Sequence, residues 1–133
     1  MRTCLVGSEM CIRDSGNLSL NPISSLTTST LVKICSNQEV RDVVKNMMNE
    51  AHEISKNLGI DKPFDVERRI EAAKAVGEHK TSMLQDLERD RPMEIDALVS
   101  SVQELGRITK VPTPTIDTVL ALVKLRAKEA KLY

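Results

Sequence analysis

The feature that most constrains this chain is a spacing of three and four residues between its apolar side chains. Between residues 40 and 58 this spacing lasts for roughly five helical turns. The residues concerned are Val40, Val43, Val44, Met47, Met48, Ala51, Ile54 and Leu58. Such spacing predicts an amphipathic α-helix, whereas a half-buried strand would alternate apolar and polar residues. No stretch of the sequence alternates in that way, so we expect an all-α fold of about five to seven helices.

Capping and turn residues divide the chain into separate helices. Ser36 and Glu39 stand at the spacing of a capping box, which predicts a helix start, and Gly59 predicts the end of that helix. Asp65 is expected to cap the next helix. Pro114 is expected to be the first residue of the last helix, since its missing N–H has no intrahelical partner there.

The most informative stretch is residues 80–96, which reads KTSMLQDLERDRPMEID. A helix containing Ser82 is predicted over residues 78–89, and Pro92 should stop it because proline has no N–H to donate. Glu94 then opens the next α-helix. Ser82 and Glu94 therefore face the ends of consecutive helices. The alternative is that one is a plain polar helix residue and the other an acid that favours a helix N-terminus.

Two asparagines at the start of the native-looking chain form a second pattern. Asn17 and Asn21 are four residues apart, so on a helix they lie one turn above each other on the same side. Pro22 is expected to kink or restart that helix. The spacing leaves two interpretations open: the asparagines form turns, or their amides face a cleft.

Composition excludes several classes of function. Nineteen basic and nineteen acidic residues cancel to a net charge of zero, so no electrostatic attraction to nucleic acid or an anionic membrane is expected. Phe64 and Tyr133 are the only aromatic residues of the Phe, Trp and Tyr class, which excludes a base-stacking platform. No apolar run approaches a membrane span. His52 has no partner at ligand spacing, so no metal site is predicted.

Residues 1–15 are predicted to be a non-native leader, and residues 16–133 the domain. Residues 5–15, LVGSEMCIRDS, back-translate into a string that resembles a transposase-type sequencing-library adaptor read in frame. A natural disordered leader is the alternative.

Cys4 and Cys11 fall in the leader, and Cys35, among apolar neighbours, is expected to be a buried structural thiol. Sparse cysteines without a CxxC pair favour a reducing cytoplasm.

Three segments resemble the C-terminal helical domain of the ketopantoate reductases (2-dehydropantoate 2-reductases), of the 6-phosphogluconate dehydrogenase C-terminal-like type. They are residues 80–96, residues 16–27 (GNLSLNPISSLT) and residues 111–125 (VPTPTIDTVLALVKL). The similarity runs from residue 16 to about residue 125. The chain departs from the common pattern at Asp90, where Gly is frequent, and at Met93, where Thr is frequent.

The resemblance implies hydride transfer from NADPH to the keto carbon of ketopantoate, giving pantoate on the route to coenzyme A. It implies that Asn17, Asn21 and Ser82 bind substrate and that Glu94 is catalytic, near both substrate and cofactor. The family's lysine, one turn before the first asparagine, is here Arg13, which cannot donate a proton near neutral pH.

The resemblance also implies partners that this chain lacks. An N-terminal Rossmann domain would bind NADPH, a small 2-oxoacid would be the substrate, and a homodimer is possible. Without that domain and lysine, the chain alone is expected to be inactive. Two alternatives remain: a non-catalytic helical interaction module, and a related 2-oxoacid reductase with another substrate.

Overall fold

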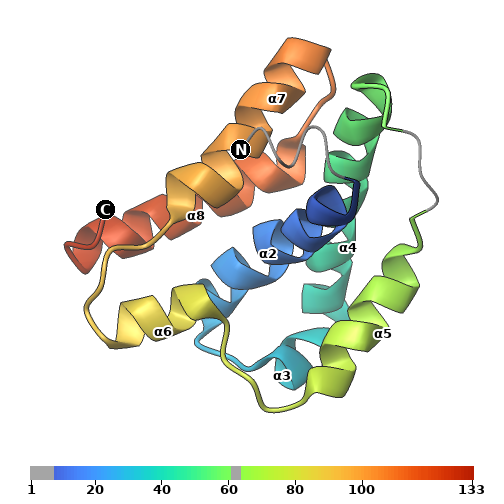
Figure 1. Ribbon diagram of the computed structural model, residues 1–133. Coiled ribbons are helices and arrows are strands. Elements are labelled where there is room, and N and C mark those ends of the chain that lie inside the picture. Colours follow the sequence, from blue (N-terminus) through green and yellow to red (C-terminus); the bar gives the residue numbers. More distant parts are fainter. Residues whose placement is uncertain (1–7, 61–63) are drawn as a thin grey trace.

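The computed structural model describes residues 8–60 and 64–133, and the side chains of residues 16–60 and 64–133. The described part contains no strand, which confirms the predicted all-α fold. Its elements, shown in Figure 1, are α2 (Ser8–Thr27), α3 (Leu31–Ser36), α4 (Gln38–Asn57), α5 (Val66–Val76), α6 (Ser82–Glu88), the π-helix η1 (Asp96–Ser100), α7 (Ser101–Thr109) and α8 (Pro114–Glu129).

Helix α2 is the centre of the fold. It packs against α3, α4, α6, η1 and α8, and Figure 1 shows it between α4 on one side and α6 and α8 on the other. The apolar stripe predicted for α4 faces this centre, with four of its side chains buried: Val44, Met47, Met48 and Ile54. Burying each such side chain contributes about 1.5–3 kcal/mol, so the stripe anchors α4 to α2.

Helix α2 runs without interruption from Ser8 to Thr27 with Pro22 inside it. The helix therefore neither ends nor restarts at Pro22. Three buried hydroxyls nearby donate to backbone carbonyls: Ser19 to Gly16 at 3.2 Å, Ser24 to Ser29 at 2.9 Å and Ser25 to Asn21 at 3.1 Å. Polar groups in this buried helix are thus satisfied locally.

The start of α4 lies one residue later than the capping box predicted. Asn37, not Ser36, is the N-cap, and its side-chain oxygen accepts from the Val40 N–H at 3.1 Å. Ser36 is instead the last residue of α3. The two other predicted helix boundaries in this region are confirmed. Asp65 accepts from the Arg68 N–H at 3.1 Å, and Gly59 follows α4 with a left-handed φ of 86°.

The helix predicted over residues 78–89 is wrong in its first four residues. Only Ser82–Glu88 are helical, and the Thr81 hydroxyl caps them by accepting from the Leu84 N–H at 3.2 Å. The preceding segment is not helical, and two of its carbonyls accept from another helix. The carbonyls of Gly77 and His79 accept from the first amides of α3, at 3.1 and 3.0 Å. Ser82 is therefore the first residue of α6, directly after the non-helical segment.

The single α-helix expected from Glu94 onward is also wrong. Helical structure starts at Ile95, and residues Asp96–Ser100 form a π-helix before α7 begins. In this segment the Ser101 N–H donates to the Asp96 carbonyl, five residues back. Apolar periodicity does not distinguish a π-turn from an α-turn, so the π-turn could not be predicted from the sequence.

Pro114 is the first residue of α8, as predicted. The cap of this helix comes from a distant residue. The Glu50 carboxylate on α4 accepts from the N–H groups of Thr115 and Ile116, both at 3.0 Å. A carboxylate favours a helix N-terminus because the N–H groups and the helix dipole both present positive charge there.

Within residues 8–60 and 64–133, none of the helices has the length and apolarity needed to cross a membrane.

Candidate functional site

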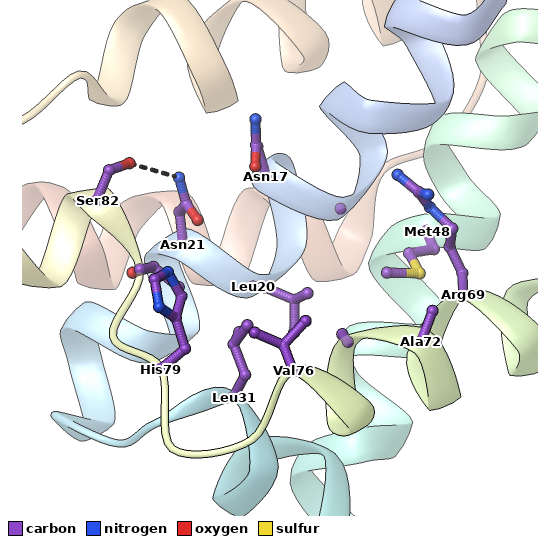
Figure 2. A pocket seen from close by; sticks show the side chains of 13 residues that line it. Asn17, Leu20, Asn21, Leu31, Met48, Arg69, Ala72, Val76, His79 and Ser82 are labelled. Atoms are coloured by element: carbon purple, nitrogen blue, oxygen red, sulfur yellow. Dashed lines mark hydrogen bonds between the residues drawn. The ribbon is translucent and has the colours of Figure 1, made fainter.

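Helices α2 and α6 bring together three of the four predicted site residues. Asn17 and Asn21 lie within α2, so they form no turn, and Ser82 begins α6. The Asn21 amide donates to the Ser82 hydroxyl oxygen across 3.5 Å, although the residues are 61 positions apart in sequence (Figure 2). A hydrogen bond this long is weak, so a bound oxygen atom can compete for both groups.

All four predicted site residues line one small pocket. It measures about 250 Å³ and is lined by Asn17, Asn21, Ser82, Met83, Asp86, Glu94, Ala97 and Leu98. Glu94 enters it from the segment between α6 and η1, and its side chain is exposed. Amide and hydroxyl groups can donate to a carboxylate or carbonyl oxygen, and a carboxylate can accept from a hydroxyl. The set therefore suits a small molecule that carries an acid or ketone together with a hydroxyl.

A larger cavity of about 540 Å³ shares Asn17, Asn21 and Ser82. Figure 2 shows the two ends of its lining: Ser82, Asn21 and His79 at one end, and Arg69 and Met48 at the other. Between them lie apolar side chains from α2, α3 and α5, namely Leu20, Leu31, Ala72, Ala73 and Val76. The cavity thus offers an apolar wall beside the polar groups of the small pocket.

Sequence reasoning missed Arg69, His79 and Asp86 as lining residues. Arg69 lies on α5, and a Cβ on Gly16 of α2 would sit 3.5 Å from its guanidinium nitrogen. His79 belongs to the non-helical segment before α6, which was predicted to be helical. No spacing signal links these residues to the asparagine pair. Only the positions of α5, the 77–81 segment and α6 beside α2 do so.

One acid beside the site has a shifted pKa. Asp96, two residues after Glu94, accepts hydrogen bonds from the Tyr133 hydroxyl at 2.7 Å and the Ser100 hydroxyl at 2.8 Å. These two bonds hold the pKa of the Asp96 carboxyl below its ordinary value, and the bond from Tyr133 has the larger effect. The same contact raises the pKa of Tyr133 above its ordinary value.

Arg13, at the position expected for a lysine, falls on α2, but its side chain lies outside the described residues. In the part of the chain that is described, no three His, Cys, Asp or Glu residues gather in a way that could hold a metal ion.

Comparison with known proteins identifies relatives over nearly the whole chain. The family described as "Ketopantoate reductase PanE/ApbA C terminal" matches residues 10–127. A 2-dehydropantoate 2-reductase of Mesorhizobium japonicum is 58% identical over 128 residues, which cover 96% of this chain and 39% of that protein. The match to the family begins at residue 10, inside the predicted leader, and α2 begins at Ser8.

Solved structures share the fold. A protein assigned as a ketopantoate reductase from Ralstonia solanacearum superposes with a TM-score of 0.88 at 39% identity, covering 94% of this chain and 38% of that one. The 2-dehydropantoate 2-reductase from Methylococcus capsulatus gives a TM-score of 0.86 at 29% identity, covering 94% and 40%. The chain therefore spans about two fifths of the length of these relatives.

Proposed function

The chain belongs to the ketopantoate reductase family through its C-terminal helical domain, and from this premise we propose that it forms the substrate side of an NADPH-dependent 2-dehydropantoate 2-reductase. The reaction is the reduction of ketopantoate to pantoate. The observation that carries this proposal is the convergence of Asn17, Asn21, Ser82 and Glu94 on one pocket. A cytoplasmic location and a homodimer remain predictions.

Each polar group in the pocket has a role that its chemistry allows. The amides of Asn17 and Asn21 and the hydroxyl of Ser82 donate to the oxygens of the 2-oxoacid. The Glu94 carboxylate accepts from the hydroxyl group of the substrate. These four side chains bind and orient the substrate, so that its keto carbon is held for attack.

The described residues fit only one end of NADPH. They contain no strand followed by a glycine-rich loop, the arrangement that holds dinucleotide phosphates. The exposed Glu94 carboxylate can accept from ribose hydroxyls. When bound, the cofactor supplies the hydride. The chain by itself is therefore expected to bind NADPH weakly and to reduce no ketopantoate.

The new hydroxyl of the product requires a proton at the former keto oxygen. The family resemblance assigns that proton to a lysine at the position of Arg13. A guanidinium keeps its proton near neutral pH, so Arg13 could stabilise negative charge but not supply the proton. The identity of this residue in the native protein is therefore decisive for activity.

Ser82→Ala tests the binding role in the longer protein that carries this domain. Loss of a hydrogen bond to a charged substrate group costs about 1.5–3 kcal/mol, so we expect KM for ketopantoate to rise about 10- to 100-fold. Ser36→Ala, an exposed serine outside both pockets, is the matched control and should leave KM unchanged. An unchanged KM in Ser82→Ala would contradict the role.

Assays with a panel of 2-oxoacids separate the alternatives. Turnover of another 2-oxoacid in preference to ketopantoate would identify a related reductase. Absence of turnover with every 2-oxoacid, with either NADPH or NADH, would favour a helical interaction module.

We also infer that residues 1–15 are a non-native leader and that the native domain begins near Gly16. The support is the adaptor-like sequence of residues 5–15. Helix α2 and the family match both cross this boundary, so neither marks it. Sequencing intact genomic DNA upstream of the Gly16 codon decides the matter. Codons for residues 5–15 in that DNA would refute the inference.

A further inference from the structure

The last two residues of the sequence lie against the segment that carries Glu94. The Met93 N–H donates to the Leu132 carbonyl at 3.1 Å, and both side chains are buried, at 6% and 9% exposure. Figure 1 shows the C-terminal end of α8 next to the connection that runs from α6 to η1. This contact fixes the backbone immediately before Glu94.

A second contact fixes the backbone after Glu94. The Tyr133 hydroxyl donates to the Asp96 carboxylate at 2.7 Å, the same oxygen that accepts from Ser100 at 2.8 Å. The Tyr133 ring also lies beneath the ammonium groups of Lys124 and Lys128, at 5.9 and 5.8 Å. Attraction between the two cations and the ring favours the ring orientation in which the hydroxyl faces Asp96.

Glu94 itself is exposed and precedes the first helical residue, Ile95. A flexible acidic side chain in such a place takes its direction from the backbone that carries it. The contacts at Met93 and Asp96 lie on either side of Glu94, one through the main chain and one through a side chain. Asp96 is also the first residue of the π-turn, and its carbonyl accepts from the Ser101 N–H.

We propose that Tyr133, together with the main chain of Leu132, is a positioning residue that holds Glu94 at the small pocket. The proposal rests on the function proposed above for Glu94. The Tyr133 hydroxyl bonds to Asp96, which lines neither pocket, so Tyr133 acts through the 93–96 segment and not on the substrate.

Amide hydrogen exchange on this chain tests the mechanical part. Tyr133→Phe removes only the hydroxyl and keeps the ring beneath the two lysines. We expect the Met93 and Ile95 amides to exchange about tenfold faster, because a hydrogen bond to a charged group is lost. Amides of α4 should be unaffected.

Gln103→Met is the matched control, because it removes an exposed hydrogen bond of 2.7 Å to a carboxylate, Asp117, that also accepts from a second side chain, Thr113. Exchange at Met93 should be the same in this variant as in the parent chain. Equal exchange at Met93 in Tyr133→Phe and the parent chain would overturn the proposal.

A double-mutant cycle in the longer protein tests the functional part. Tyr133→Phe should lower kcat/KM about five- to tenfold when Glu94 is present, and less than about twofold in a Glu94→Gln background. Equal losses in both backgrounds would reflect a general structural effect and would overturn the positioning role. If the parent protein reduces no 2-oxoacid, the proposed function fails, while the exchange measurement still decides whether Tyr133 holds the segment.

Discussion

Gly106 shows how one residue can be fixed by close packing inside a helix. A Cβ at this position of α7 would lie 2.8 Å from the Thr113 side chain and 3.2 Å from the Val111 carbonyl oxygen. The first contact is closer than real Cβ atoms allow, and the second is to backbone that cannot turn aside. The tight turn between α7 and α8 therefore requires a residue without a Cβ at position 106.

Gly106→Ala is predicted to destabilise the fold. Alanine is favoured over glycine in a helix interior by about 1 kcal/mol, but overpacking costs about 1–3 kcal/mol. We expect the steric cost to exceed the gain in propensity and the midpoint of urea unfolding to fall. Glu104→Ala, an exposed change on the same helix, is the control and should alter stability by less than about 0.5 kcal/mol. A higher midpoint for Gly106→Ala would contradict the packing argument.

Single residues were predicted well where their role is local. Asp65 caps α5 through its own side chain, and Cys35 is buried among apolar neighbours as expected, with burial raising the pKa of its thiol. The role of the two asparagines could not be predicted from their spacing alone. Residues four apart on a helix share a face, but only the position of α6 decides that the face of Asn17 and Asn21 meets Ser82.

At the scale of elements, two helices depend on residues remote in sequence. The carbonyls of Gly77 and His79, in the non-helical segment before α6, accept from the first amides of α3, and Glu50 of α4 caps α8. Local patterns could not show either contact, because the partners lie about 45 or more positions apart. The helical stripe of α4 and the start of α8 at Pro114 depend on local sequence and were predicted.

Glu50→Ala is predicted to destabilise the protein through the N-terminus of α8. It removes two charge-assisted hydrogen bonds and leaves the N–H groups of Thr115 and Ile116 partly buried without their acceptor. The expected loss in free energy of unfolding is about 2–3 kcal/mol. Glu53→Ala, on an exposed position of the same helix, should cost much less. Similar losses for the two variants would rule out the capping role.

The link between α4 and α5 is predicted to depend on pH through Glu67. Its carboxylate contacts Lys45 at 2.9 Å and Arg41 at 2.8 Å, and these bonds lower its pKa from 4.5 to about 2. Because the folded pKa is below the ordinary value, the stabilisation is present above about pH 4.5 and is lost as pH falls toward about 2.

Thermal unfolding of the parent chain and Glu67→Gln across this pH range measures the effect. The parent should be the more stable of the two near neutral pH, and the difference should shrink in acid and in high salt, since the group is exposed. A difference that stays constant between pH 6 and pH 2 would argue against an ionic link.

At the scale of the whole molecule, the fold is an α2-centred bundle that presents its polar site on one side. Asn17, Asn21 and Ser82 line both cavities, and Val76, 59% exposed, lines the larger one. The fold class followed from periodicity alone, since apolar spacing determines whether helices or strands can bury a core. The proposed function followed from the family resemblance, because no charge, metal or nucleotide-binding pattern in the sequence identifies a substrate.

The reductase activity of Glu94→Gln tests the central claim most directly. In the proposed full-length reductase that carries this domain, oxidation of NADPH in the presence of ketopantoate is followed by absorbance for the parent and the variant. The account predicts that oxidation depends on ketopantoate and that Glu94→Gln lowers kcat/KM about 100-fold or more, with thermal stability unchanged. A variant as active as the parent would contradict the claim that Glu94 belongs to the active site.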